Sequence, residues 1–359
     1  MSKNRSKGER RGPYFAAANS GRGFVSFYKD VFGGKALARR YLIKGGPGTG
    51  KSHFLGRVAE YALNAGRDVA FYRCSSDPDS LDGIVIDGMI AVLDATAPHS
   101  MEATLPGARD EIIDLGAFWD GEALAASAAR IEELNHSKRE AYGRAYRFLS
   151  AALEVEEANR SLIESAIRRE KLERAVDRLC RQLPEGISFA AEPCLTEAIG
   201  MRGRARFDSL VREADRVYWI EENDGEASFY LAALAQRAVE KRWRMQVSYD
   251  PLCPDRIRGL LLCDSGICFA ATDAPADRSL GERINMKRFL DHDALAACRA
   301  RLRSNRRLKE ALIDSAVESF GQAGEHHFAL EQIYGACMDF EAENRFLESF
   351  CQDKLKAYL

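Results

Sequence analysis

The sequence lacks any long apolar segment, any clustered cysteines and any excess of one charge. No apolar run among its 359 residues approaches the roughly 20 that a transmembrane helix needs, so we expect no membrane span. Its nine cysteines include no CxxC pair, which argues against a disulfide scaffold and favours a reduced, cytoplasmic setting. The formal net charge of -2 implies no bulk attraction to nucleic acid or to anionic lipid.

The opening stretch, MSKNRSKGERRGP, lacks the apolar core of a secretory signal peptide. It is basic and polar, and we expect residues 1–13 to form a disordered tail. The chain as a whole is 46% hydrophobic and 30% charged, which is the balance of a globular protein, and its length allows two or three domains.

One long segment of the sequence occurs twice. DPDSLDGIVIDGMIAVLDATAPHS aligns with CPDRIRGLLLCDSGICFAATDAPADR, which places Pro78 on Pro254 at an offset of 176 residues (254 − 78). Offsets within a few residues of this value relate GRGFVSF to MRGRARF and VDRLCRQL to LESFCQDKL. A repeat of this length indicates two copies of one module. We place the boundary at the turn-forming stretch LPEG, which gives domains at 14–185 and 186–359.

Each half reads as short strands and helices followed by a long helical tail. In the first half, RRYLIKG, DVAFYRC, GIVID and MIAVLDAT are typical of buried strands, and residues 51–65 form an amphipathic helix that Gly66 ends. Strands that alternate with helices favour a parallel sheet. Residues 121–183 read as helix throughout, and one rod of that length would measure roughly 90 Å. We therefore expect a hairpin of two helices that turns near EEANRS.

The segment YLIKGGPGTGKSHF contains the strongest motif of the sequence. Its residues GGPGTGKS match G-x-x-x-x-G-K-[ST] between an apolar strand and an amphipathic helix. Glycines let successive backbone N–H groups turn towards phosphate oxygens, above the positive end of the helix dipole. Lys51 would reach the β and γ phosphates, and the Ser52 hydroxyl would ligate Mg²⁺. The candidate nucleotide-binding residues are Gly45, Gly46, Pro47, Gly48, Thr49, Gly50, Lys51, Ser52 and His53.

A magnesium site of this kind needs a carboxylate at the end of a neighbouring buried strand. MIAVLDAT supplies Asp94, which we prefer to Asp87 after GIVI because the strand before Asp94 is more apolar. The predicted metal ligands are therefore Ser52 and Asp94, and we assign catalytic roles to Lys51 and Asp94.

Two further segments follow predicted strands and are expected to line the same crevice. In CSSDPDSLDG, Asp77, Asp79 and Asp82 could orient a water or bind a second substrate, although Asp and Ser are also ordinary turn residues. In TAPHS, His99 could sense the γ phosphate or act as a general base. Asp77 and His99 are therefore added to the candidate catalytic residues.

The second half lacks the groups that this chemistry needs. Its equivalent segment, VYWIEENDGEASFYL, keeps the strand, but the loop has no lysine, one glycine and four acidic residues. Like charges repel at that range, so we expect no phosphate to bind there. Such a copy is retained if it packs against the first one or supplies an arginine to it. The candidate arginines are Arg202, Arg204, Arg256 and Arg258.

Taken together, the motifs resemble those of a family of bacterial tandem-repeat P-loop proteins described as ATPases. The resemblance rests on GFVSFY, YLIKGGPGTGKS, RCSSDPDSLDGIVI, VLDATAPH, PGARDEIIDLGAFWD and AYRFLSAA, which cover most of residues 14–185. It implies binding of ATP or GTP and, position by position, roles for Lys51, Ser52 and Asp94. In that family the second repeat commonly keeps an intact phosphate loop, and the present sequence departs from the family there.

We therefore predict an α/β fold of two tandem P-loop NTPase-like α/β/α modules with mainly parallel sheets, each with a long helical hairpin. The predicted function is Mg²⁺-dependent binding and hydrolysis of ATP in the first copy, with an unknown protein partner that reads the motion of the hairpins. ATP is preferred to GTP because no guanine-reading NKxD stretch is present. Two alternatives stay open. The chain could be a nucleotide-sensing scaffold, since no Glu follows Asp94, or a small-molecule or nucleotide kinase, since an acidic loop lies beside the phosphate site.

Overall fold

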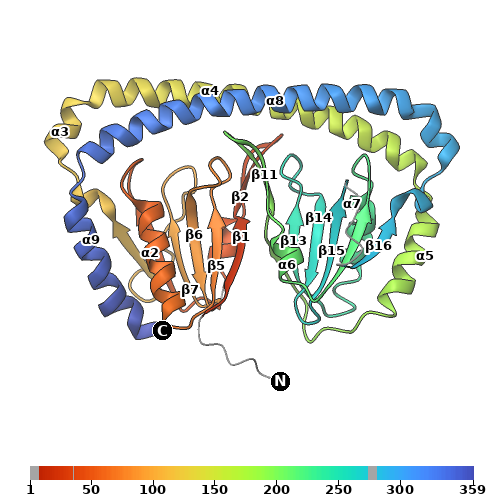
Figure 1. Ribbon diagram of the computed structural model, residues 1–359, viewed down its shortest axis with the longest axis horizontal. Coiled ribbons are helices and arrows are strands. Elements are labelled where there is room, and N and C mark those ends of the chain that lie inside the picture. The colour runs from red at the N-terminus through yellow and green to blue at the C-terminus, as the bar shows by residue number, and fades with distance from the viewer. Residues whose placement is uncertain (1–7, 35, 274–280) are drawn as a thin grey trace.

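A computed structural model describes residues 8–34, 36–273 and 281–359. It shows two α/β lobes side by side, with two long helices that lie across both of them (Figure 1). Each lobe holds a six-stranded, mixed and mostly parallel sheet, so the prediction of two tandem α/β modules is confirmed. No helix among these residues combines the length and the apolarity of a membrane span.

The first lobe consists mainly of strands β1 (Arg10–Phe15), β4 (Arg39–Lys44), β5 (Val69–Arg73), β6 (Leu81–Ile86), β7 (Ile90–Asp94) and β8 (Asp110–Asp114), with helices α1 (Tyr28–Phe32) and α2 (Lys51–Asn64). The strand order is β1-β5-β6-β7-β4-β8, and β6 runs antiparallel to both of its neighbours. Side chains alternate across β4: Tyr41 and Ile43 pack against α2, and Leu42 packs on the opposite face with α1.

The second lobe repeats this plan with strands β9 (Ala190–Pro193), β12 (Arg216–Glu221), β13 (Arg244–Tyr249), β14 (Ile257–Leu262), β15 (Ile267–Thr272) and β16 (Gly281–Asn285), and helices α6 (Ser209–Arg212) and α7 (Ala227–Gln236). The order β9-β13-β14-β15-β12-β16 matches the first sheet strand for strand, with β14 as the antiparallel member. The repeat in the sequence is therefore also a repeat of topology.

Part of the segment expected to form a disordered tail is a strand. Residues 1–7 lie outside the described residues, but Arg10–Phe15 form β1, so the prediction of disorder through residue 13 is wrong. Strand β1 pairs in parallel with β5 at the edge of the sheet, and Arg11 forms an ion pair of 2.8 Å with Glu213 of the second lobe. Backbone hydrogen bonds and this ion pair order residues 10–13, which have little apolar area to bury, while Tyr14 and Phe15 are buried in the core.

The helical hairpin expected at 121–183 is not formed. Helix α4 (Ala128–Ala166) runs without a break through EEANRS, where the turn was expected. The second half of α4 contains no Gly or Pro that would end a helix. Glu156, in the expected turn, instead forms ion pairs with Arg256 at 2.9 Å and with Lys309 at 2.7 Å. Helix α4 therefore leaves the first lobe and ends on the second.

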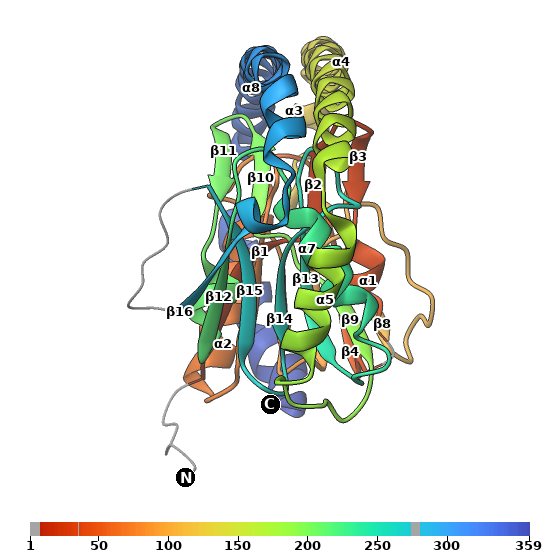
Figure 2. The same ribbon diagram turned by 90° about the vertical axis from the view of Figure 1, so that its right-hand side faces the viewer.

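A second long helix, α8 (His292–Ala336), runs back from the second lobe to the first, beside α4 (Figure 1 and Figure 2). The two helices meet along apolar stripes, where Tyr142 and Tyr146 of α4 contact the ring of Phe320 in α8 edge-on. Phe320 is almost fully buried. The apolar stripe of α4 is thus part of the interior of the molecule.

Each long helix carries the final helix of its repeat to the opposite lobe. Helix α5 (Arg169–Cys180) follows α4 and packs its apolar side into the core of the second sheet. Helix α9 (Phe340–Ser349) follows α8 and packs into the core of the first sheet, beside α2 (Figure 1). The predicted domains 14–185 and 186–359 therefore exchange their final helices, because the unbroken long helices span both lobes, and no single boundary separates the lobes.

The lobes also touch at the centre of the molecule. Phe15 and Leu195 exchange backbone hydrogen bonds of 2.8 and 3.2 Å, and their side chains share a small core with Ala18 and Ala198. The fold is completed by short strands and helices: β2 (Ala17–Ser20), β3 (Gly23–Ser26), β10 (Glu197–Gly200), β11 (Gly203–Arg206), α3 (Gly121–Ala126), η1 (Leu115–Phe118), η2 (Met286–Phe289), η3 (Phe350–Leu355) and η4 (Lys356–Tyr358).

Candidate functional site

The glycine-rich loop Gly45–Ser52 joins the end of β4 to the start of α2 in the first lobe. Gly48 and Gly50 have φ values of +69° and +79°, a left-handed backbone that favours glycine. Gly48 also has no room for a side chain, because a Cβ there would lie 2.4 Å from the carbonyl oxygen of Glu331 in α8. The loop thus lies directly against a helix that comes from the other repeat.

Lys51 is the first residue of α2, and its side chain turns back into the loop. Its Nζ donates hydrogen bonds to the carbonyl oxygens of Gly45 at 3.0 Å and Gly46 at 2.6 Å, and it lies 3.7 Å from Asp94 Oδ2. Asp94 ends β7, which pairs with β4, so the sheet brings the two charges together. Asp87, the alternative carboxylate, lies in the turn at the opposite end of β7. The structure therefore brings together Lys51 and Asp94, which the sequence selected.

Other residues of the loop brace it against its surroundings. Thr49 is fully buried, and its Oγ1 donates to the Gly46 carbonyl at 2.9 Å. The Ser52 hydroxyl accepts a hydrogen bond of 2.9 Å from the backbone N–H of Leu81, which ties the loop to the start of β6. His53 is exposed on the surface of α2. Ser52 is thus well fixed, whereas His53 makes no recorded polar contact among the described residues.

The acidic loop after β5 faces the second repeat. Arg202, in the turn between β10 and β11, forms ion pairs with Asp77 at 3.2 Å and with Asp79 at 2.7 Å. Asp77 is thus held by the second repeat rather than by Lys51. The other three arginines considered from the sequence pair elsewhere: Arg204 with Glu310, Arg256 with Glu156 and Glu157, and Arg258 with Glu222 and Glu197.

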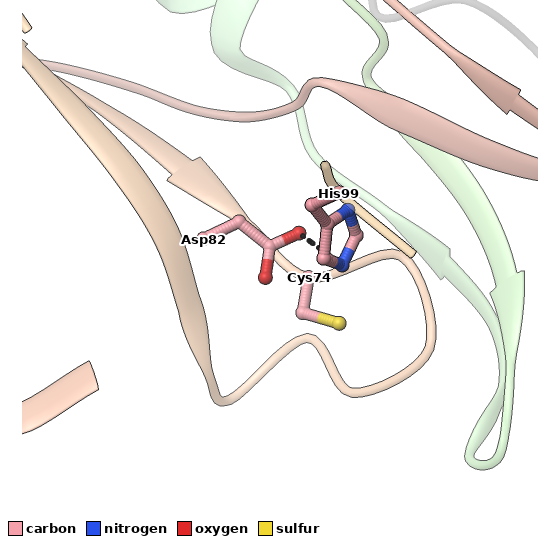
Figure 3. Close-up of side chains that lie close together, drawn as sticks. All are labelled: Cys74, Asp82 and His99. Atoms are coloured by element: carbon pink, nitrogen blue, oxygen red, sulfur yellow. Dashed lines mark ion pairs between the residues drawn. The ribbon is translucent and has the colours of Figure 1, made fainter. Parts of the chain in front are cut away.

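Cys74, Asp82 and His99 form a cluster in which Asp82 and His99 are buried and Cys74 is partly buried (Figure 3). Asp82 lies in β6, the strand next to the one that ends at Asp94. His99 Nε2 is 3.5 Å from Asp82 Oδ2, and the His99 ring stacks on Tyr28 with 5.0 Å between the ring centroids. Burial raises the pKa of Asp82, although the imidazole of His99 opposes the shift, and burial also raises the pKa of the Cys74 thiol. The sequence pointed to Asp82 and His99 separately, and nothing in it singled out Cys74.

A cavity of about 530 Å³ lies next to the glycine-rich loop. Two aromatic side chains line it: Trp119, which follows η1, and Tyr334 of α8. Their ring centroids are 5.5 Å apart. Both rings touch the loop, because a Cβ at Gly46 would lie 3.2 Å from Tyr334 and 3.3 Å from Trp119. The remaining lining residues are Leu124, Ala128, Ile131, Glu132, Asn135 and Arg139.

Positive charge gathers around the loop and this cavity. Burial lowers the pKa of Lys138 in α4, and the charges of Lys51 and Arg139 lower it further, although Glu331 has the opposite effect. Lys51 and Arg139 are thus close enough to Lys138 to act on it, and cations gathered in this way favour the binding of an anion. The positive end of helix α2 acts in the same direction.

The second lobe has a smaller cavity, of about 180 Å³, at the equivalent place. At an offset of 171 residues, Trp119 corresponds to Leu290 (290 − 119) and Tyr334 to Ile163 (334 − 163), and both of these line the smaller cavity. Aliphatic side chains thus replace both aromatic rings. The other lining residues are Asn223, Asp224, Glu226, Lys287, His292, Leu295 and Arg299.

The equivalent loop of the second lobe is occupied by its own carboxylates. Glu226 accepts hydrogen bonds from the backbone N–H groups of Asn223 at 3.0 Å and Asp224 at 2.7 Å. Glu222 accepts one from the N–H of Ala227 at 2.9 Å. In a loop of this shape, these backbone donors are the groups that would otherwise contact a bound anion. Internal carboxylates thus satisfy donors that a phosphate would need.

Neither charged residue of the first loop has a counterpart in the second lobe. Ala227 opens α7 as Lys51 opens α2. Ala271 pairs with β12 at the position where Asp94 pairs with β4. The two lobes therefore share a topology but differ in the chemistry of this site.

Comparison with known proteins adds no assignment: the chain matches no protein-family model, no curated protein and no solved structure. What the site can do is therefore inferred from its own residues and their geometry.

Proposed function

We propose that the chain binds Mg²⁺-ATP at the glycine-rich loop Gly45–Ser52 and hydrolyses it, and that the second lobe binds no nucleotide. The observation that carries the proposal is the pairing of Lys51 with Asp94 inside a left-handed glycine loop at the start of a helix. The second lobe supports it by contrast, because the same fold there lacks both charges and both aromatic rings.

The loop offers a triphosphate several kinds of attraction. Its backbone N–H groups and the start of α2 favour negative charge, and Lys51 supplies a full positive charge. On binding, the Lys51 ammonium would exchange its contacts with the Gly45 and Gly46 carbonyls for phosphate oxygens. Phosphate oxygens carry negative charge and the carbonyl oxygens do not, so this exchange favours the ligand.

Residues for a magnesium ion are present beside Lys51. The carboxylate of Asp94 and the hydroxyl of Ser52 are oxygen donors of the kind that Mg²⁺ prefers, so these residues fit the ion. When bound, Mg²⁺ would neutralise charge on the β and γ phosphates during cleavage. Asp94 is 15% exposed, so it is accessible to a bound ion.

The aromatic cavity suits the base of the nucleotide. Trp119 and Tyr334 present rings next to Gly46, and an adenine would stack on them while its phosphates extend into the loop. Arg139 and Lys138 add positive charge on the side of α4. The nucleotide site is thus assembled from both repeats, because Tyr334 belongs to the second.

A nucleotide sensor is the second candidate function. Ala95, not a glutamate, follows Asp94, and a carboxylate at that place often orients the attacking water. Glu331 and Tyr334 of α8 lie against the loop, and the other end of α8 lies on the second lobe. Binding of ATP would therefore change the contacts of a helix that reaches both lobes, whether or not hydrolysis follows.

Calorimetry with Mg²⁺-ATP tests the binding site. The full chain is expected to bind one equivalent, and Lys51→Ala to lose about 2–3 kcal/mol, which is roughly 30- to 150-fold in affinity. Lys287→Ala is the matched control, because Lys287 lines the equivalent cavity of the second lobe. The proposal fails if the full chain binds no nucleotide, or if both variants lose the same amount.

ATP labelled in the γ phosphate separates the candidate reactions. Release of inorganic phosphate that depends on Lys51 supports an ATPase. Tight binding with unchanged ATP supports the sensor, and transfer of label to a small molecule in an extract supports a kinase.

A further inference from the structure

We propose that Cys74, Asp82 and His99 form a binding site for a divalent cation of the zinc type. The three side chains bring a sulfur, a carboxylate oxygen and an imidazole nitrogen within 4.8 Å of one another in the interior of the first lobe (Figure 3). The proposal does not depend on nucleotide binding, since none of these residues belongs to the glycine-rich loop.

The order of the strands assembles the cluster. Cys74 directly follows β5, Asp82 is the second residue of β6, and His99 lies shortly after β7. These three strands are neighbours in the sheet. Because β6 is antiparallel, its start lies at the same edge as the ends of β5 and β7. A cation at this edge would connect the segments that follow β5 and β7 to the start of β6.

One poorly paired carboxylate oxygen marks the site. Asp82 is 4% exposed, and its Oδ2 is buried without a hydrogen-bond partner among the described residues. His99 Nε2 is 3.5 Å away from that oxygen, which is too long for a strong hydrogen bond. The Tyr28 hydroxyl is also buried, and it makes no hydrogen bond of ordinary geometry to a described residue, although it lies close enough to Asp82 to act on that carboxylate. A carboxylate in such surroundings is costly unless a cation compensates it.

The imidazole is held in place for binding. His99 stacks on Tyr28 and meets the ring of Phe24 edge-on with 5.2 Å between centroids. Its backbone N–H donates to the Thr96 carbonyl at 2.9 Å. With the ring fixed on two sides, Nε2 is directed towards Asp82. A ligand fixed by its neighbours loses little freedom when a metal binds.

The donor set selects the metal. Thiolate, imidazole and carboxylate together suit Zn²⁺, whereas Mg²⁺ takes oxygen ligands in octahedral geometry. Ligand atoms of a tetrahedral zinc site lie roughly 3.3–3.8 Å apart, given bond lengths of about 2.0–2.3 Å. Shifts of about 1 Å in the ligand atoms, produced by small side-chain rotations, would therefore bring all three into bonding distance of one ion. With three protein ligands, a water molecule would complete the coordination.

The second repeat does not keep these groups. At the offset of 176 residues, Cys74 corresponds to Asp250 and Asp82 to Arg258 (258 − 82). Arg258 forms an ion pair with Glu222 there. The Cys74 and Asp82 ligands therefore occur in the repeat that also keeps Lys51 and Asp94.

Cobalt titration of the metal-free full chain tests the site, because Co²⁺ reports a bound thiolate through a charge-transfer band. The chain is expected to bind one equivalent with such a band, and Zn²⁺ to abolish the band by displacement. Cys74→Ala should lose the band, and Cys263→Ala should keep it, because Cys263 is an exposed cysteine outside the cluster. Lys51→Ala should also keep it, which separates this site from the nucleotide site.

Affinity and stability complete the test. Asp82→Asn and His99→Gln are expected to weaken Zn²⁺ binding at least tenfold in competition with a chelating dye. If these variants fail to fold, the melting temperature of the unaltered chain tests the proposal instead. Zn²⁺ should raise that temperature, and Mg²⁺ should not. The absence of both the band and the rise in the unaltered chain overturns the proposal, as does equal binding by Cys74→Ala.

Discussion

Replacement of Gly48 by alanine tests the contact between the glycine-rich loop and the end of α8. Gly48 has a φ of +69°, and a Cβ there would lie 2.4 Å from the carbonyl oxygen of Glu331. Gly88, in the turn between β6 and β7, has a φ of +70°, but a Cβ there would meet no atom of a described residue within 4 Å. The two alanine variants thus share the backbone strain and differ only in the contact with α8.

The expected magnitudes follow from this difference. Alanine in the left-handed region costs about 1–2 kcal/mol, which is the full loss expected for Gly88→Ala. Gly48→Ala adds the cost of overpacking, about 1–3 kcal/mol, because the backbone of Glu331 must move. Its total loss is then about 2–5 kcal/mol. Each kcal/mol of lost stability lowers the melting temperature of a domain of about 150–250 residues, the size range of one lobe, by roughly 2–4 °C.

Scanning calorimetry of the two variants and the unaltered chain is the assay. Gly48→Ala should melt clearly below Gly88→Ala, and it should also bind Mg²⁺-ATP more weakly, since the displaced helix carries Tyr334. Equal melting temperatures for the two variants would refute the inferred contact between the loop and α8.

Two further predictions concern the base site and acid stability. Trp119→Ala should weaken ATP binding by about 1–3 kcal/mol, the contribution of a base–aromatic stack, and leave inorganic triphosphate binding unchanged. Leu290→Ala should change neither, and an equal effect of both variants in calorimetry contradicts the base site. Burial alone would raise the pKa of Asp110, but hydrogen bonds from Arg109, from backbone N–H groups and from Arg40 outweigh it and hold that pKa well below its usual range. Because its pKa is lower in the folded state, Asp110 stabilises the fold at pH values above its unfolded pKa of about 4. This stabilisation is lost as the pH falls below that value. The stability gap between the unaltered chain and Asp110→Asn should therefore shrink on acidification, and a gap that stays constant with pH counts against this reasoning.

Features with a local cause were predictable from the sequence. GGPGTGKS contains the glycines that its own left-handed turns need, and Asp94 follows an apolar run typical of a buried strand. The pairing of that strand with β4 then brings Asp94 to Lys51. The expectation that the second loop binds no phosphate has the same local basis, because its acidic side chains lie in the loop itself.

Features that depend on distant partners were not predictable. A helix-forming sequence at 121–183 does not reveal whether the chain folds back or continues, because this depends on partners such as Arg256 for Glu156. Tyr334 reaches the glycine-rich loop only because α8 spans both lobes. Cys74 joins Asp82 only because β6 is inserted antiparallel beside β5.

The exchange of final helices has a consequence for how the protein is made. A ribosome synthesises the sheet of the first lobe early, yet the side chains of α9 that cover this sheet emerge only after the whole second lobe. The lobe that is begun first is thus completed last. A nascent chain interrupted before residue 334 would contain the glycine-rich loop but not the Tyr334 ring of the second repeat that contacts it.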